Sequence, residues 1–250
     1  LFRSIFVVCV GEKMTNLPGI SGKIVGVQGR NGVNVRAIAQ GSAERNISVV
    51  ISTKDVKKAI NILHEEFFET SFKQVNLFIA GTGNVGSRLL AQLHQQQQHL
   101  QNHLKLQLKI AGIANSKKML FNDEGIDLSD WKNDLGNGEK MNLETFTSTI
   151  QKRNLRNTVF IDVNSNNDIA NTYHGFLQKS ISVVACNKIA SSSAFSYYQE
   201  LKNLAREFNA LFLFETNVGA GLPVIGTLND LLRSGDKVNK IEAVLSGTLN

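Results

Sequence analysis

Three glycines, spaced by two and then three residues, follow an apolar run in the first half of the chain. The run at 75–80 reads "VNLFIA", the glycines lie in "GTGNVG", and a helical pattern begins directly afterwards. The first glycine permits a tight turn, the second lets a ligand approach the backbone, and the third lets helix and strand pack closely. N–H groups at the helix start would face a pyrophosphate and stabilise its charge. We therefore predict a dinucleotide-binding turn made of Gly81, Thr82, Gly83, Asn84, Val85 and Gly86; a chance glycine turn is the alternative.

The next strand-like stretch ends in Ala114, Asn115, Ser116, Lys117 and Lys118. At this place NAD-specific sites carry an acidic residue that hydrogen-bonds the ribose hydroxyls. No Asp or Glu is present, whereas an amide, a hydroxyl and a lysine charge would suit a 2′-phosphate. The sequence therefore predicts binding of NADP(H) in preference to NAD(H), with a polar loop that contacts no cofactor as the alternative.

Two further strand ends carry polar side chains. In "IDVNSNND", Asn164 and Ser165 could hydrogen-bond a nicotinamide ribose or carboxamide, although a helix cap at Ser165 or Asn167 is an equal alternative. In "VVACNKIASSS", Lys188 directly follows an apolar strand. A partly desolvated ammonium at this point could donate to a carbonyl or carboxylate, and a solvated lysine at a strand end is the alternative.

The stretch "FETNVGAGLPVIG" combines a carboxylate with a bent loop. Glu215 lies at a strand end, Gly219 and Gly221 bend the backbone after it, and Pro223 stiffens it. A carboxylate beside inward-turned carbonyls is a site for a hard cation. The alternative is a simple loop in which the carboxylate caps a helix.

The elements that must position these residues alternate between strands and helices from residue 72 onwards. Such alternation predicts an α/β fold with a Rossmann-like, doubly wound parallel sheet that binds ligands at the carboxyl ends of its strands. The segment 121–146 predicts only loop and short helix. The expected strands are 75–80, 104–115, 158–164, 180–188 and 210–217, and the expected helices are 85–98, 167–178 and 194–208.

Residues before 70 have a different order, strand, helix, strand, strand, helix, with the second helix opened by Asp55. This order predicts a small ferredoxin-like α+β domain, an antiparallel sheet with helices on one face. Asn34, Gln40 and Ser42 are polar residues at strand ends beside glycines, where an amino-acid ligand could reach the backbone. A packing or dimerisation domain without a ligand is the alternative.

Composition limits the classes of function. The chain has 250 residues, 42% hydrophobic and 19% charged, which suffices for two domains with buried cores. The net charge of +6 is not gathered in a basic stripe, so we expect no nucleic-acid partner. No apolar run reaches the roughly 20 residues of a membrane span, so we expect no membrane partner. Cys9 and Cys186 lie in apolar runs, which predicts buried free thiols in a soluble, cytoplasmic protein.

The stretch "LPGISGKIVGVQGRNGVNVRAIAQGSAERNISVVI" resembles the second ACT unit of aspartate kinases. That resemblance implies a regulatory domain that senses an end-product amino acid. Gln40, in "AIAQGS", matches the position that is associated in the family with threonine sensing.

A second resemblance covers the rest of the chain. The segments "FIAGTGNVGSRLLAQL", "IAGIANSKKML", "CNKIASSS", "TNVGAGLPVI" and "VLSGTLN" resemble homoserine dehydrogenase, and an ACT unit directly upstream resembles the bifunctional aspartate kinase and homoserine dehydrogenase. The resemblance implies NADPH-dependent reduction of L-aspartate 4-semialdehyde to L-homoserine, threonine feedback and a homo-oligomer. It also implies that the chain is a central fragment, nearly inactive alone, with a kinase domain before it. The domains would be 1–70 (ACT), 71–233 (NAD(P)-binding) and 234–250 (start of a substrate and dimerisation domain).

The same resemblance assigns roles to individual residues. Lys188, with its neighbour Asn187, would be the catalytic lysine at the junction of nicotinamide and substrate. Two departures concern the nicotinamide contacts: the usual Thr-Ser-Ser is Asn-Ser-Asn at 164–166, and a second lysine is replaced by Ile189. Other classes remain as alternatives, namely a purely regulatory protein or another NADP-dependent oxidoreductase. A monovalent cation, Na⁺ or K⁺, would be held by Glu215 and by the carbonyls of Val218, Ala220 and Leu222.

Overall fold

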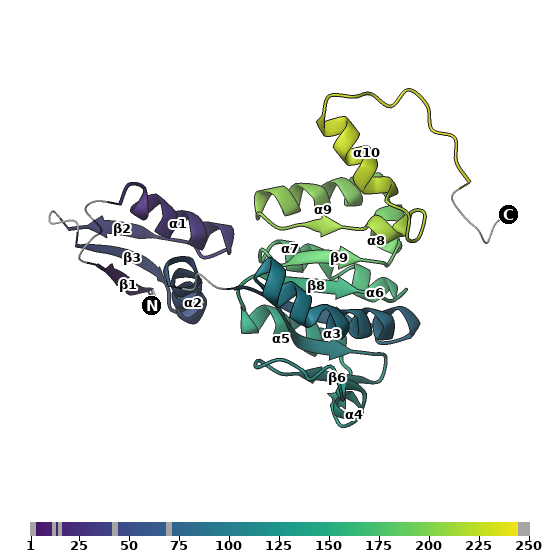
Figure 1. Ribbon diagram of the computed structural model, residues 1–250, viewed down its shortest axis with the longest axis horizontal. Coiled ribbons are helices and arrows are strands. Elements are labelled where there is room, and N and C mark those ends of the chain that lie inside the picture. Colours follow the sequence, from purple (N-terminus) through teal and green to yellow (C-terminus); the bar gives the residue numbers. More distant parts are fainter. Residues whose placement is uncertain (1–3, 12–13, 15–16, 42–44, 69–71, 245–250) are drawn as a thin grey trace.

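The computed structural model describes residues 4–11, 14, 17–41, 45–68 and 72–244, which form two sheets in two consecutive units (Figure 1). The N-terminal unit, up to residue 68, has the predicted order of strands and helices. Its sheet has the order β1-β3-β2 with antiparallel pairing throughout. The elements are β1 (Ser4–Val10), α1 (Ile20–Arg30), β2 (Ala37–Gln40), β3 (Asn46–Ser52) and α2 (Val56–Phe67).

The core of the N-terminal unit lies between its central strand and its two helices. Strand β3 buries every second residue, Ile47, Val49 and Ile51, and these side chains pack with Ile24 of α1 and Ile62 of α2. Because side chains alternate between the two faces of a strand, this pattern puts both helices on one face of the sheet, as predicted.

The second unit, called here the α/β unit, contains a seven-stranded sheet of the order β10-β9-β8-β4-β5-β6-β7. The five strands from β10 to β5 are parallel, and β6 and β7 add an antiparallel edge. Chain order reverses between β4 and β8, and such a switch point opens a crevice at the carboxyl ends of the strands. The bounds are β4 (Lys73–Ala80), β5 (Leu106–Ala114), β6 (Lys118–Phe121), β7 (Glu139–Lys140), β8 (Thr158–Asp162), β9 (Ser182–Ala185) and β10 (Phe212–Leu213).

Helices cover both faces of this sheet, which confirms the doubly wound arrangement. On one face Leu90 of α3 packs with Ile79 and Ile113. On the other face Phe160 packs with Phe176 of α7, together with apolar residues of α5 and α9. The helices are α3 (Asn84–Leu104), α4 (Trp131–Gly136), α5 (Leu143–Arg153), α6 (Asn167–Ala170), α7 (Tyr173–Leu177), α8 (Ile189–Ser192), α9 (Phe195–Glu207) and α10 (Val224–Arg233).

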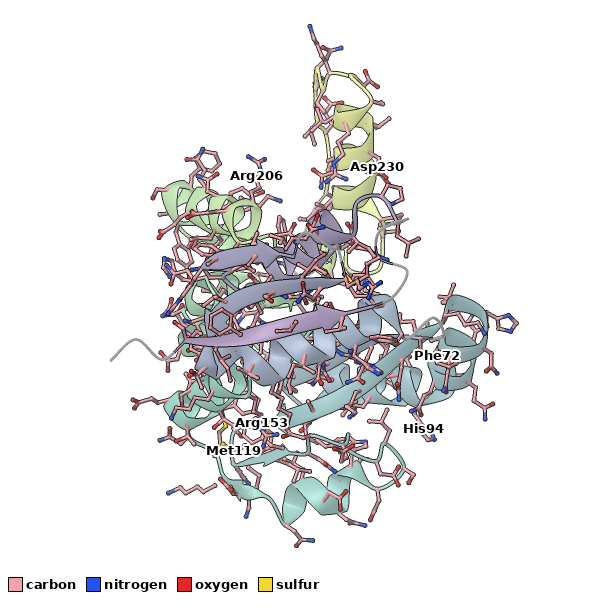
Figure 2. The ribbon with its side chains drawn as sticks, turned by 90° about the vertical axis from the view of Figure 1, so that its left-hand side faces the viewer. Phe72, His94, Met119, Arg153, Arg206 and Asp230 are labelled. Atoms are coloured by element: carbon pink, nitrogen blue, oxygen red, sulfur yellow. The ribbon has the colours of Figure 1, made fainter. Side chains whose placement is uncertain are left out.

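Several predicted boundaries are corrected. Leu104 ends helix α3 instead of beginning a strand, so the helix extends past the glutamine run. The helix expected at 167–178 is divided into α6 and α7. In the segment 121–146, α4 fits the short helix that was expected, whereas β7 and the start of α5 were not expected, and neither was α10. Figure 2 shows Asp230 of α10 projecting away from both sheets, and residues 234–244 are exposed throughout. The "LSGTLN" segment lies outside the described residues.

The two units meet through polar contacts between α2 and the loop from α5 to β8. Asp55 does not cap α2; its carboxylate accepts a hydrogen bond from Asn154 Nδ2 at 2.9 Å. Lys58 Nζ donates to Asn154 Oδ1 at 2.9 Å, and Arg156 pairs with Glu65 at 3.2 Å. Polar interfaces of this kind are typical of units that move relative to one another.

Within the described residues, no helix is both long and apolar enough to span a membrane. Cys9 and Cys186 are free, as predicted, but half-buried instead of fully buried.

Candidate dinucleotide site at the carboxyl edge of the sheet

The first and third glycines of the predicted turn are required by the backbone itself. Gly81 has a φ of +110°, which residues other than glycine rarely adopt. Its N–H donates a hydrogen bond to the carbonyl of Ala114 at 2.8 Å. A Cβ on Gly81 would lie 2.7 Å from the Val163 carbonyl oxygen. A Cβ on Gly86 would lie 2.0 Å from the Gly81 carbonyl oxygen. The turn and the helix start are therefore in contact, as the sequence predicts.

The second glycine is different, because it faces open space. A Cβ on Gly83 would meet no heavy atom of the described residues within 4 Å. Gly83, Asn84 and Val85 are exposed, Thr82 is half-buried, and the first turn of α3 has no acidic residue. No side chain in the described part of the chain caps this helix start, so the backbone here fits a pyrophosphate group.

The loop after β5 is closed by its own asparagine. Asn115 Oδ1 accepts hydrogen bonds from the backbone N–H groups of Lys117 and Lys118, both at 2.8 Å. The Lys118 ammonium donates to the Gly138 carbonyl at 2.8 Å, so it is engaged within the fold. Ser116 and Lys117 are exposed, and their side chains have no polar partner in the part of the chain that the structure describes. These two groups remain available to a phosphate.

Asn164 holds the loop after β8 in place. Its Nδ2 donates to the Ala80 carbonyl at 3.2 Å and its Oδ1 accepts from the Asn166 N–H at 2.7 Å. Asn166, and neither Ser165 nor Asn167, caps α6. Ser165 is exposed and has no hydrogen bond among the described residues, so its hydroxyl is the group that a ligand could use.

Lys188 lies directly before α8, next to a buried asparagine. Its side chain is exposed, which corrects the prediction of a partly desolvated ammonium. Asn187 is only 2% exposed. The Asn187 Nδ2 donates to Asp162 Oδ2 and to the Asn166 carbonyl, both at 3.0 Å, and its Oδ1 accepts from the Ile189 N–H at 3.1 Å. The residues before and after Lys188 are therefore both anchored through the Asn187 amide.

Asp162, the last residue of β8, is a site residue that sequence reasoning did not single out. Its carboxylate is fully buried and accepts from the Tyr173 hydroxyl at 2.5 Å, from Asn187 and from the Asn164 N–H at 3.0 Å. Burial raises the pKa of Asp162, and these three hydrogen bonds oppose that shift. Burial, followed by the charge of Asp162, raises the pKa of Tyr173. The signal that could have indicated Asp162 is its position as an acidic residue inside the apolar run "VFIDV".

Glu215 adopts the capping role that the sequence left as the alternative. Its carboxylate accepts from the N–H groups of Ile225 at 2.9 Å and Gly226 at 2.6 Å, at the start of α10. The Leu222 carbonyl accepts from the Val224 N–H at 2.9 Å.

The loop after Glu215 nevertheless leaves acceptors unpaired. Among the described residues no N–H group bonds the Val218 or Ala220 carbonyl. The Asn217 Oδ1 is buried and has no donor in the same part of the chain. No group of three or more His, Cys, Asp or Glu residues is arranged for a metal within the described ranges, so a cation here would depend on carbonyl oxygens.

The sheet order brings these loops into one row, in the sequence β10, β9, β8, β4, β5. The predicted effector residues are not brought together in the same way, because Gln40 ends β2 and Asn34 lies before its other end. Both are exposed, and Ser42 lies outside the described residues.

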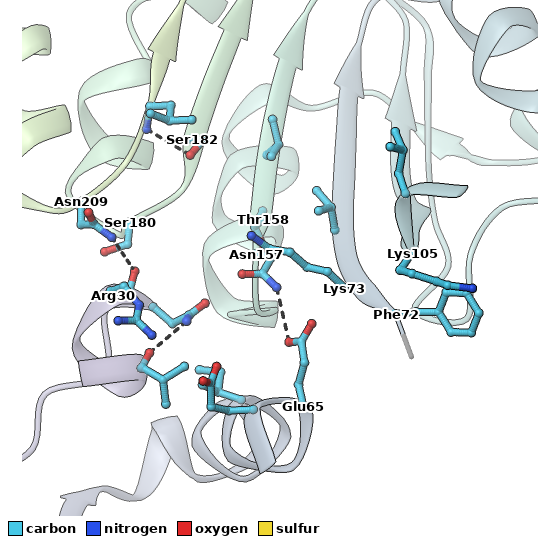
Figure 3. Close-up of a pocket in the computed structure, with 18 residues that line it drawn as sticks. Arg30, Glu65, Phe72, Lys73, Lys105, Asn157, Thr158, Ser180, Ser182 and Asn209 are labelled. Atoms are coloured by element: carbon cyan, nitrogen blue, oxygen red, sulfur yellow. Dashed lines mark hydrogen bonds between the residues drawn. The ribbon is translucent and has the colours of Figure 1, made fainter. Parts of the chain in front are cut away.

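A cavity of about 810 Å³ lies at the opposite edge of the sheet, between the two units. Figure 3 shows Glu65 joined to Asn157, and Asn209 beside Arg30. Because this cavity adjoins the amino ends of the strands, it is separate from the row of loops described above.

Comparison with known proteins gives two family matches. Residues 81–215 match the family described as "Homoserine dehydrogenase, NAD binding domain", and residues 7–67 match the ACT domain.

Individual relatives extend over nearly the whole chain. It is 39% identical over 243 residues to bifunctional aspartokinase/homoserine dehydrogenase 2, chloroplastic, of Arabidopsis thaliana, which covers 96% of this chain and 26% of that protein. It is 38% identical over 242 residues to the bifunctional aspartokinase/homoserine dehydrogenase of Buchnera aphidicola, a match that covers 96% of this chain and 29% of that protein. A hyperthermophilic archaeal homoserine dehydrogenase solved in complex with NADPH has a TM-score of 0.53 and 30% identity, covering 62% of this chain and 48% of that one. The chain thus spans between a quarter and a third of the length of these bifunctional relatives.

Proposed function

We propose, from the premise that the chain belongs to the homoserine dehydrogenase NAD-binding family and carries an ACT domain, that it is part of a bifunctional enzyme. One activity is the reversible reduction of L-aspartate 4-semialdehyde to L-homoserine with NADPH, and the other is phosphorylation of aspartate by residues outside this chain. The observation that carries the proposal is the open Gly83 backbone at the start of α3, in one row with the Lys188 loop.

NADPH, when bound, supplies the hydride, while the protein orients the reactants. The N–H groups at the start of α3 bind the pyrophosphate. Lys188 donates a hydrogen bond or proton to the aldehyde oxygen, directly or through water, as negative charge develops there. General acid catalysis of this kind contributes about 100 to 10,000-fold to a rate.

The preference for NADP(H) over NAD(H) is supported by the loop after β5. Ser116 and Lys117 are exposed and unpaired among the described residues, and no carboxylate in 114–118 would repel a 2′-phosphate. A hydroxyl and an ammonium are suitable donors to its oxygens.

A bound Na⁺ or K⁺ is supported by the loop after Glu215. The Val218 and Ala220 carbonyls lack protein donors among the described residues, and the Glu215 carboxylate has lone pairs beyond the two that cap α10. Leu222 would contribute its carbonyl together with these groups. Oxygen ligands of this kind suit hard cations.

Regulation by threonine is proposed for the ACT unit through Gln40, which is exposed, so an effector could reach it. Asn34 is also exposed but lies near the other end of β2, so it would not share one effector with Gln40. We further propose a homo-oligomer, and a reducing cytoplasm as the compartment, because both cysteines are free.

The test is an assay of the full-length protein with L-homoserine and NADP⁺, followed by absorbance of NADPH, with and without threonine. The proposal expects homoserine-dependent reduction that threonine inhibits. A protein that binds NADPH but oxidises no homoserine would contradict the dehydrogenase assignment.

A further inference from the structure

We propose that Asp162 is a positioning residue, which fixes the loop of Asn164 and the loop of Lys188 relative to each other. The inference rests on the proposed function, because it concerns the residues that would contact cofactor and substrate.

The first connection is within the loop after β8. Asp162 Oδ1 accepts from the Asn164 N–H at 3.0 Å, which closes a turn. The Asn164 side chain then donates to the carbonyl of Ala80, the residue before the glycine turn. One oxygen of the carboxylate thereby holds the Asn164 loop, which adds a side-chain bond to the backbone pairing of β8 and β4.

The second connection is to the loop after β9. Asp162 Oδ2 accepts from Asn187 Nδ2 at 3.0 Å, and the Asp162 carbonyl accepts from the Cys186 N–H at 2.8 Å. Since Asn187 Oδ1 also accepts from the Ile189 N–H, the residues on both sides of Lys188 are tied to this amide. The other oxygen of the carboxylate thereby sets the backbone that carries the lysine.

A third connection extends the network to the loop after β10. The Asn187 carbonyl accepts from Asn217 Nδ2 at 3.2 Å, and the same nitrogen donates to Ser191 Oγ at 2.9 Å. Asp162 is therefore linked, directly or through one amide, to the loops that follow four of the five parallel strands.

A purely structural role would not require this arrangement. A buried carboxylate is unfavourable unless all its acceptors are used, and an apolar residue would suit the interior of a sheet. Of the three donors to the Asp162 carboxylate, only the Tyr173 hydroxyl comes from the core side. The other two donors, the Asn164 N–H and Asn187 Nδ2, belong to the loops at the carboxyl edge of the sheet. The Asp162 carboxylate therefore keeps these two loops aligned.

The experiment compares Asp162→Asn with Tyr173→Phe in the full-length enzyme. An amide at 162 has only one oxygen, so either the Asn164 N–H or the Asn187 Nδ2 would face an NH₂ group. Tyr173→Phe removes one donor and leaves both loop contacts intact. We expect Asp162→Asn to lower kcat for homoserine oxidation by about tenfold or more, since misplacement near 1 Å can cost about 100-fold. We expect Tyr173→Phe to stay within about threefold of the wild-type kcat and of the wild-type NADPH affinity.

Melting temperature and a second variant separate positioning from folding. If Asp162→Asn does not fold, Asn187→Ala tests the same link and should lower kcat similarly. Asn187→Ala removes one donor to the Asp162 carboxylate, as Tyr173→Phe does, so the melting temperature of Tyr173→Phe is the reference for its stability. Equal losses of kcat in Asp162→Asn and Tyr173→Phe, or an unchanged kcat in Asp162→Asn or in its substitute Asn187→Ala, would overturn the inference. A wild type that does not oxidise homoserine would overturn the proposed function, and this inference with it.

Discussion

The Cβ position of Gly86 lies 2.0 Å from the carbonyl oxygen of Gly81, whereas the Cβ position of Gly83, between them, lies more than 4 Å from every heavy atom in the described ranges outside its own chain neighbours. Two of the three glycines are therefore needed by the protein itself. The remaining one leaves the backbone open, as the close approach of a ligand requires.

Gly83→Val should abolish NADPH binding while leaving the melting temperature near that of the wild type, because the added side chain meets solvent until a pyrophosphate approaches. Fluorescence titration with NADPH and thermal melting measure the two quantities. Gly86→Ala is the control and should lower the melting temperature instead. Wild-type NADPH affinity in Gly83→Val would contradict the assigned turn.

The loops of this site could be predicted because each apolar strand ends at a polar or glycine residue, a pattern that is local in the sequence. Helix α5 could not be predicted, because it buries only two side chains, Phe146 and Ile150, and most of its other residues are polar. The hydrogen bonds of Asp162 could not be predicted from the sequence either, because its partners Tyr173 and Asn187 are 11 and 25 residues away along the chain. The cap formed by Glu215 could be predicted only as an alternative, because a carboxylate before a glycine- and proline-containing loop fits both a cap and a cation ligand.

Asn115→Asp should weaken NADPH binding about tenfold and leave NADH affinity within about twofold. A carboxylate at 115 can accept the same two N–H groups and keep the turn, but it adds negative charge near the proposed 2′-phosphate, where about 1 to 4 kcal/mol of repulsion is expected. Titration with both cofactors measures the change. Asn122→Asp is a matched control, because Asn122 Oδ1 closes a similar turn at the other end of β6. Equal effects on both cofactors would argue against a 2′-phosphate at this loop.

Glu215→Ala should lower the free energy of unfolding by about 1 kcal/mol, since two N–H groups at the start of α10 lose their acceptor. Chemical denaturation measures this loss, with the exposed Asp230→Ala on the same helix as the control. If the neighbouring carbonyls also hold a cation, replacing K⁺ and Na⁺ by choline should lower wild-type activity. If wild-type activity is the same in choline as in K⁺ and Na⁺, Glu215 has a capping role alone.

Lys58 should make stability rise at alkaline pH. Burial lowers the pKa of Lys58 from 10.5 to about 8. The negative charge of Asp55 opposes this shift, and the positive charge of Lys179 adds to it. Because the folded-state pKa lies below the unfolded value, the charged ammonium destabilises the fold fully below pH 8, and this penalty disappears as pH rises from about 8 to 10.5. The unfolding free energy relative to Lys58→Met should therefore rise by up to about 3 kcal/mol across that window. The exposed Lys57→Met serves as control, and parallel pH profiles of Lys58→Met and wild type would refute the shift.

The central claim is that Lys188 acts on the substrate at the edge of a bound nicotinamide cofactor. Its most direct test measures NADPH affinity and the rate of homoserine oxidation for Lys188→Ala in the full-length enzyme, beside wild type and the exposed control Lys140→Ala. We predict that the rate falls by about 100 to 10,000-fold in Lys188→Ala only, while NADPH affinity stays within about tenfold. A Lys188→Ala enzyme that oxidises homoserine at the wild-type rate would contradict the account.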